Sequence, residues 1–317
     1  MTYQPATIAE DPANLPKLPG WVTTGRVETL ETVAFRSGAA LAVLDQLISD
    51  PSHGVPLKLL ANRLALSAAT ATSKLEGRLA RAADIRDAYY LTPPGEARGP
   101  DGDMLAYWRD AVRLRLLGPR DIADLIGADF AGEVGVRLDA AAERARTHGP
   151  LAGCVAVLPA VLEVDDRAER VACLLSDVIL ARALNWKTVL PVSAQRLTKT
   201  VLRNMTANGQ GAELAVQVRI LESIEETIRQ ARDLARRAEA LGAVSAKLRA
   251  KGSAAAVDLF LTEDAVAPSG MLSPTIRGTT IEMTSRAARR FCDRLVELGV
   301  AQELTGRPTF RLYGIGS

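Results

Sequence analysis

Apolar residues recur at three- and four-residue spacing along most of the chain, and proline and glycine interrupt the pattern at intervals. Such spacing places apolar side chains on one face of a helix, so it predicts a series of amphipathic helices that pack through those faces. At Asp50-Pro51 and His148-Gly149-Pro150, proline is expected to end a helix. The predicted helices cover residues 27–50, 56–75, 82–91, 101–117, 122–126, 133–147, 151–162, 167–184, 190–200 and 212–241.

Two stretches lack the helical period. Residues 1–26 contain four prolines and little apolar spacing, which predicts a flexible proline-rich tail anchored by Trp21. Residues 204–211 are polar, with two asparagines and two glycines, which predicts a linker.

The longest predicted helix, 212–241, carries an apolar stripe that includes Leu221, Ile224 and Ile228, and a face rich in glutamate and arginine. A surface helix that closes a bundle has this pattern, because one stripe faces the core and the charged face meets water. A coiled coil with a protein partner would also show it. We favour the bundle helix.

The pattern changes near residue 245. A helix is predicted over 254–261, followed by a loop at 267–280 that is rich in Pro, Gly, Ser and Thr. A strong helix of about fourteen residues then begins at Met283-Thr284-Ser285, where a hydroxyl can cap the first turn. Gly299 is placed to end this helix.

Beyond Gly299 the apolar period changes from about four to two. Residues 300–304 and 308–313 alternate apolar with polar side chains and are joined by Thr305-Gly306-Arg307, which predicts a β-hairpin. The order helix, turn region, capped helix, hairpin resembles the winged-helix family. The predicted fold is therefore mainly α, with a multi-helix bundle domain (27–244) followed by a small C-terminal winged helix (245–317).

Arginines gather on one side of the predicted recognition helix. At about 100° per residue, Arg286, Arg289 and Arg290 fall opposite its apolar stripe and in its first half. In helix-turn-helix proteins this half of the recognition helix enters the major groove, where arginine reads guanine and contacts phosphate. Arg307 and Arg311 on the hairpin could contact the DNA backbone. We therefore predict double-stranded DNA as a partner; docking of a protein on the same face is the alternative.

Composition limits this hypothesis. The chain has 317 residues, of which 24% are charged and 4% aromatic, and a formal net charge of +2. These values are typical of a globular helical protein and give no overall attraction to a polyanion. From Lys247 onward there are ten Lys and Arg against seven Asp and Glu, so any basic surface is local.

The cysteines and histidines indicate no special chemistry. Cys154, Cys173 and Cys292 are far apart and odd in number, which indicates a reducing compartment without a disulfide framework. His53 and His148 have no Cys or His nearby, so no metal site is predicted. The N-terminus has no signal-peptide pattern and no apolar run is long enough to span a bilayer, so we expect a cytoplasmic protein without membrane contact.

Motifs of known enzyme chemistry are absent from the sequence. It contains no phosphate-binding glycine loop, no Gly-x-Ser-x-Gly elbow and no zinc-ligand spacing. We therefore predict no cofactor and expect no enzyme, with one alternative left open. Asp45, Arg63 and Asp177 lie within apolar stretches, where charges are costly unless they are paired. They could form buried ion pairs or line a small-molecule site.

Several stretches also resemble one family over its length, the bacterial proteins grouped as domain-of-unknown-function family 1403. The matching stretches are 38–45, 60–66, 85–88, 175–181, 184–186, 247–252 and 305–314. The resemblance covers roughly residues 27–315 and implies a shared architecture, with no catalytic residues to transfer. It includes Asp87 with Asp45, Arg63 and Asp177, and these four residues are our candidates for a buried polar network. The helical domain would bind a protein partner or a second copy of the chain.

Overall fold

The computed structural model describes residues 15–26, 29–93, 95–114, 119–245, 248 and 251–316. Most of the predicted tail therefore lies outside the described residues, as do Lys247 and Arg249. The chain is mainly helical. Its helices are α1 (Gly20–Thr23), α2 (Leu30–Ser49), α3 (Leu57–Leu75), α4 (Ala82–Tyr90), α5 (Gly99–Ala111), α6 (Pro119–Ile126), α7 (Ala128–His148), α8 (Pro150–Leu162), α9 (Glu169–Ala183), α10 (Lys199–Thr206), α11 (Ala212–Ser245), α12 (Ser253–Phe260) and α13 (Ser285–Glu297).

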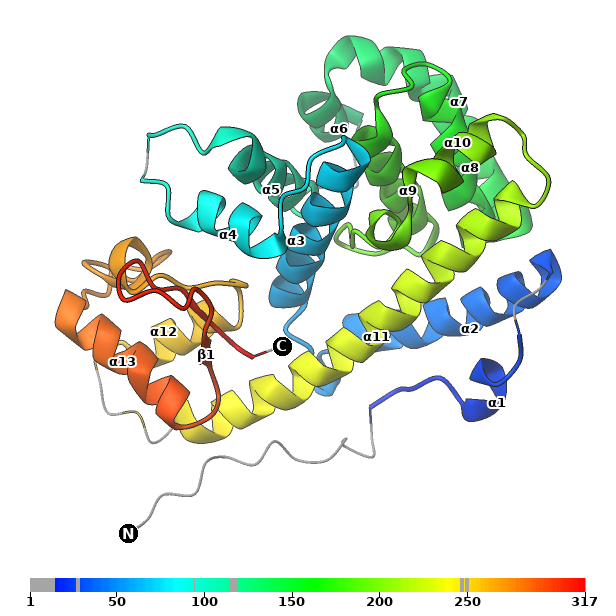
Figure 1. The fold of residues 1–317 in the computed structure, drawn as a ribbon. Coiled ribbons are helices and arrows are strands. Elements are labelled where there is room, and N and C mark those ends of the chain that lie inside the picture. Colours follow the sequence, from blue (N-terminus) through cyan, green and yellow to red (C-terminus); the bar gives the residue numbers. More distant parts are fainter. Residues whose placement is uncertain are drawn as a thin grey trace.

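The longest helix, α11, crosses the molecule and lies beside α2 (Figure 1). Thr29 begins α2, because its hydroxyl accepts the Thr32 N–H at 3.2 Å, and Asp50-Pro51 ends the helix as predicted. The stripe residues Leu221 and Ile224 on α11 are buried. The interpretation of α11 as a bundle helix is therefore confirmed.

Helices α7, α8 and α9 pack together at one end of the bundle (Figure 1). The approach of α7 and α8 is close at Gly153, where an added Cβ would lie 2.4 Å from the Ala145 Cβ. A larger side chain at this position would separate the two helices. Within the described ranges, no helix combines the length and the apolar character needed to cross a bilayer.

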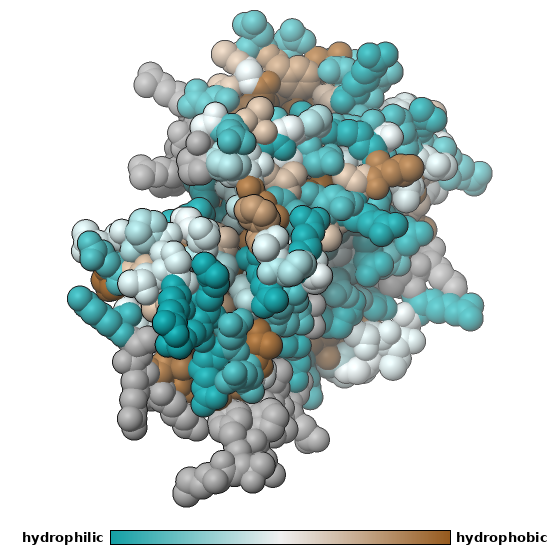
Figure 2. Space-filling model, turned by 60° about the vertical axis from the view of Figure 1, so that its left-hand side comes forward, coloured by the Kyte–Doolittle hydropathy of each residue, from teal (hydrophilic) through white to brown (hydrophobic). Residues whose placement is uncertain are grey.

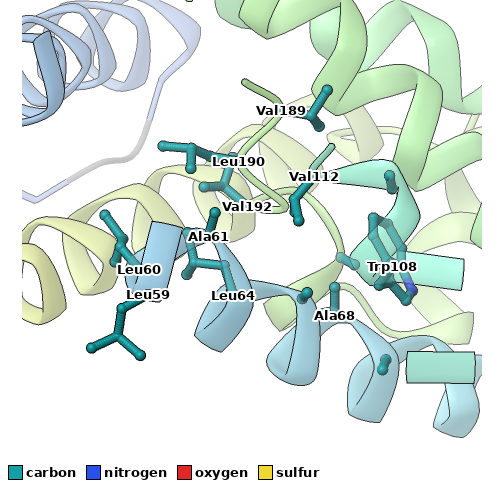
Figure 3. Close-up of a cluster of buried hydrophobic side chains, with 14 of the residues drawn as sticks. Leu59, Leu60, Ala61, Leu64, Ala68, Trp108, Val112, Val189, Leu190 and Val192 are labelled. Carbon is teal, nitrogen blue, oxygen red and sulfur yellow. The ribbon is translucent and has the colours of Figure 1, made fainter. Parts of the chain in front are cut away.

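The centre of the bundle is formed by α3, α5 and the segment 189–192. Leu60 and Leu64 of α3 face Leu190 and Val192, and Trp108 of α5 lies beside Ala68 (Figure 3). All of these side chains are buried. The Trp108 Nε1–H donates to Thr72 Oγ1 at 3.0 Å, so the indole is buried with its polar atom satisfied. Trp108 is thus a core residue in the last turn of α5.

The prediction of a helix over 190–200 is wrong. The backbone N–H groups of Val192 and Ser193 donate to the Asp177 carboxylate at 3.2 and 2.9 Å, so this segment runs along α9 in a non-helical conformation. A short turn over Ala194–Arg196 follows. Thr198 then caps α10, which occupies the first part of the predicted 204–211 linker. A buried carboxylate supplied the hydrogen bonds that a helix would otherwise supply.

The C-terminal segment, residues 251–316, consists of α12, a turn over Pro268–Leu272 (η3), α13, and the strands β1 (Gln302–Glu303) and β2 (Tyr313–Gly314). The strands pair antiparallel, with Glu303 opposite Tyr313. Tyr313 also exchanges backbone hydrogen bonds with Val266 at 2.7 and 2.9 Å. The hairpin is confirmed, with shorter strands than the alternation predicted. The buried apolar residues of the segment join those of the bundle in one cluster.

Trp21 does not anchor the N-terminal part of the chain. Its side chain is 71% exposed, and its ring lies near that of Phe35 of α2, with centroids 6.1 Å apart. Leu15 and Val22 are buried instead. The smaller aliphatic residues insert between helices, where an indole would require a larger space.

Trp108→Ala should lower the free energy of unfolding by about 3–5 kcal/mol, because it empties a closed part of the core and leaves Thr72 without its indole partner. Urea unfolding followed by circular dichroism measures the change. The matched control is Leu79→Ala, whose side chain is 91% exposed and should change stability by no more than about 0.5 kcal/mol. Equal losses for both variants would contradict the assigned core.

Candidate functional site

The bounds of helix α13 are fixed by the residues at its two ends, and its orientation is fixed by one apolar face. Thr284 caps it, accepting the Ala287 N–H at 3.3 Å, and Gly299 follows it with a φ of 73°. Ala288, Phe291 and Leu295 are buried, and the Phe291 ring packs on Phe260 of α12 with centroids 6.2 Å apart. This packing turns the opposite face of α13 to solvent.

The three predicted arginines lie on that outer face. Arg286, Arg289 and Arg290 are exposed, and among the described residues none of them has a hydrogen-bonding or ion-pair partner. Near the C-terminal end of α13, Arg294 pairs with Glu297 at 2.9 Å. Figure 2 shows a group of hydrophilic side chains in the lower middle of the view, beside smaller hydrophobic patches. Cationic side chains at the start of α13 are thus free to meet an anion.

The two hairpin arginines behave differently from those on α13. Arg307 lies 3.3 Å from the Asp87 carboxylate of α4, so its charge is partly engaged. Arg311 is exposed and donates from Nε to the Arg307 carbonyl at 3.1 Å. Between them Phe310 is 74% exposed and has a φ of 55°. The hairpin tip therefore presents one exposed aromatic ring and one exposed guanidinium, which is held by the Arg307 carbonyl.

A buried ionic cluster joins the C-terminal segment to the helical bundle. Arg109 of α5 is 1% exposed; its Nη1 lies 2.8 Å from Asp264 Oδ1 and its Nη2 contacts Glu263. The Tyr90 hydroxyl of α4 lies 2.9 Å from Glu263 Oε2 and also contacts Asp264. Burial raises the pKa of the Asp264 carboxyl, while the nearby Arg109 lowers it. The cluster fixes the two acidic residues inward, away from the surface of α13.

Two of the four candidate network residues lie at the same junction. Asp87 pairs with Arg86 at 2.7 Å and with Arg307. Arg63 of α3 donates from Nη2 to the carbonyl of Ile315, near the end of the chain. The side chains of Arg63 and Asp87 therefore bind the C-terminal segment from two different helices.

The other two candidates lie elsewhere. Asp45 accepts from Trp186 Nε1 at 2.8 Å and links α2 to the end of α9. Asp177 is fully buried on α9, where burial raises the pKa of its carboxyl from 3.8 to about 8. Ser193 Oγ lies 2.9 Å from both Asp177 Oδ2 and the Cys173 carbonyl, and its single proton serves only one of them. A protonated Asp177 resolves this, because its own O–H donates to Ser193.

The sequence prediction missed Arg109, Tyr90, Glu263 and Asp264. One signal was available: Glu263 and Asp264 are adjacent carboxylates between apolar runs, and Arg109 follows the core residue Trp108. Which of these charges meet is decided by the packing of α5 against residues 263–264. That contact joins residues that are more than 150 positions apart in the chain.

Other groups with reactive side chains are inert. Cys154, Cys173 and Cys292 are free and buried, and burial raises the pKa of each thiol. Within the described part of the chain, no three His, Cys, Asp or Glu side chains gather where they could hold a metal ion.

Comparison with known families agrees with this architecture. The family described as "Protein of unknown function (DUF1403)" matches residues 6–315. The chain belongs to this family. The DUF1403 match thus includes the bundle, the buried ionic cluster and the C-terminal segment in one unit. A search of curated proteins gave no match.

Asp177→Asn should change the pH dependence of stability. A folded pKa of about 8 against an unfolded value of 3.8 means that the stabilising contribution of Asp177 is fully present below pH 3.8 and is lost as pH rises to about 8. The loss is at most about 1.4 kcal/mol per pH unit. Asparagine keeps a donor for Ser193 and does not ionise. Between pH 4 and pH 8, the unfolding free energy of the wild type should therefore fall relative to that of the variant. A difference that is independent of pH would show that Asp177 is charged in the fold.

Arg109→Met should destabilise the chain by about 3–5 kcal/mol, because it leaves Glu263 and Asp264 buried without a cation. Limited proteolysis should show faster cleavage within residues 251–316, and urea unfolding gives the free energy. The triple variant Arg109→Met, Glu263→Gln, Asp264→Asn removes the charges together and should recover part of the loss. A single variant as stable as wild type would contradict the structural role of the cluster.

Proposed function

We propose that this protein binds double-stranded DNA through the outer face of α13, with the C-terminal segment acting as a winged helix. The observation that carries the proposal is the group Arg286, Arg289 and Arg290, which are exposed and without partners among the described residues. They occupy the first half of α13, the part of a recognition helix that reaches base edges and phosphates in the major groove.

The order of elements supports the winged-helix interpretation. α12 is followed by the extended residue Val266, the η3 turn, α13 and then β1 and β2. Tyr313 pairs with Glu303 in the two-stranded sheet and forms an isolated bridge to Val266 on its other side, which is where a third strand lies in a winged helix. In this interpretation the loop between β1 and β2 is the wing, and Phe310 and Arg311 are two of its exposed side chains. Arg307 contributes less because Asp87 engages it.

The charge distribution also favours an anionic partner. Glu263 and Asp264, two of the seven acidic residues after Lys247, are buried against Arg109. Glu303 is engaged by the hairpin turn, accepting the Thr305 and Gly306 N–H groups at 2.8 and 2.9 Å. The acidic residues that remain on α13, Asp293 and Glu297, lie in its second half. The first half of α13 thus carries three arginines and no carboxylate, although Glu282 lies exposed just before the helix.

One segment with this modest charge should bind DNA weakly. We therefore propose that a second copy of the chain or a protein partner, held by the helical bundle, adds the second contact that gives useful affinity.

The test uses the full chain, because Arg63, Arg86 and Arg109 of the bundle hold the C-terminal segment in place. Binding to a random-sequence duplex is measured by fluorescence anisotropy across a series of salt concentrations. Affinity should fall steeply with salt, and Arg289→Ala with Arg290→Ala should reduce the slope of log K against log salt by roughly 1–2.

The matched control is the double variant Arg137→Ala and Arg146→Ala, which removes two exposed arginines from α7. It should keep the wild-type slope. Equal slopes for both double variants, or no binding at low salt, would overturn the DNA proposal and favour docking of a protein on the same face.

A further inference from the structure

A cleft of about 550 Å³ lies between the bundle and the C-terminal segment. Its walls come from α3, α4 and α11 on one side, and from residues 264, 302, 304 and 315 on the other. This volume is within the range of small-molecule sites in proteins. Three arginines line it, one from each helix: Arg63, Arg86 and Arg229.

Arg63 lacks the partner that a half-buried cation requires. Its Nη2 donates to the Ile315 carbonyl, but among the described residues no carboxylate lies within 4 Å of its guanidinium. Its Nε and Nη1 have no hydrogen-bond partner among those residues. Neither atom is fully buried, so both can be reached from solvent. Burial lowers the pKa of Arg63 from its ordinary value. Arginine remains protonated nonetheless. The carboxylates of Asp264 and Asp233 favour its charge only from beyond ion-pair distance, so the guanidinium keeps donors free for an anion.

The carboxylates around the cleft are engaged by other arginines. Asp264 is paired with Arg109 at 2.8 Å. Asp233 is paired with Arg236 and Arg237 at 2.9 and 2.6 Å. None of these three ion pairs uses Arg63, so its charge is not cancelled at close range.

The other two arginines of the cleft also keep free donors. Arg229 contacts Glu226 through Nε and Nη2, and Glu226 lies 4.0 Å from Arg196 as well. Arg86 contacts Asp87 through the same two atoms, which leaves the Nη1 of both residues without a partner among the described residues.

A second hollow continues from the cleft and shares Ser67 and Ala82 with it. Lys74, Arg196 and Lys199 line this hollow, and Lys199 lies 3.2 Å from Glu169. The two hollows together present more cations than free carboxylates. A negatively charged small molecule would therefore be attracted to this side of the bundle.

We infer that the cleft binds a small organic anion, whose carboxylate or phosphate group is held by Arg63 with Arg86 and Arg229. Arginine suits this task because its planar donors match two oxygens of either group. The bound anion would contact helices of the bundle directly and would lie against Leu304 and Ile315 of the C-terminal segment. The inference does not depend on DNA binding, since no residue of α13 lines the cleft.

The experiment measures the thermal unfolding of the full chain with inorganic phosphate and, separately, with succinate as probes. Sodium chloride keeps the ionic strength constant. A ligand at ten times its Kd should raise Tm by roughly 2–4 °C and the rise should saturate. Saturation with phosphate alone indicates a phosphoryl ligand; with succinate alone it indicates a carboxylate ligand.

Arg63→Met and Arg229→Met should each remove most of the saturable rise. Arg229 is 61% exposed, so its variant tests the site even if Arg63→Met fails to fold. Arg146→Met on α7, with 73% exposure and an ion pair to Glu143, is the matched control and should respond as wild type. The inference is overturned if neither probe gives a saturable rise, or if the two cleft variants respond as the control does.

Discussion

The pairing of Arg109 with Glu263 and Asp264 is the interaction on which the arrangement of this protein depends. It lies between α5 and the start of the loop after α12, and Arg109 is almost fully buried. Charges in such a place must be matched, because one unpaired ion costs several kcal/mol. The C-terminal segment can therefore dock on the bundle in one orientation only. That orientation brings Ile315 to Arg63 and places the outer face of α13 away from the bundle.

The same pairing separates charge within the C-terminal segment. Two carboxylates are removed from the surface while the arginines at the start of α13 remain on it. The chain therefore has a positively charged surface at the start of α13, although its net charge is only +2. The cluster contains two carboxylates for one guanidinium, and its excess negative charge helps to stabilise Arg63 nearby without contacting it. One arrangement of acidic residues therefore accounts for both the exposed cations of α13 and the unpaired cation of the cleft.

Most helices could be predicted from the sequence because their signals are local. Apolar period, Pro51 and Thr284 act within a few residues, and the helices they define are present. The segment 190–200 could not be predicted, since Asp177 satisfies the backbone of Val192 and Ser193 from another element. The exposed face of α13 followed from helical geometry, whereas the partner of Arg63 and the role of Arg109 depend on contacts between distant parts of the chain. The division into domains at residue 245 stays a prediction.

In the proposed complex, the hairpin and α13 would not contribute equally. Arg307 belongs to a chain of charges, Arg86 to Asp87 to Arg307, that links α4 to the hairpin. A phosphate that contacts Arg307 must compete with Asp87. Binding through the hairpin therefore breaks the Arg307–Asp87 ion pair while it forms the contact to phosphate. Arg286, Arg289 and Arg290 of α13 have no such competitor among the described residues. Binding energy should therefore come mainly from α13, while the hairpin responds to binding by loosening its contact with the bundle.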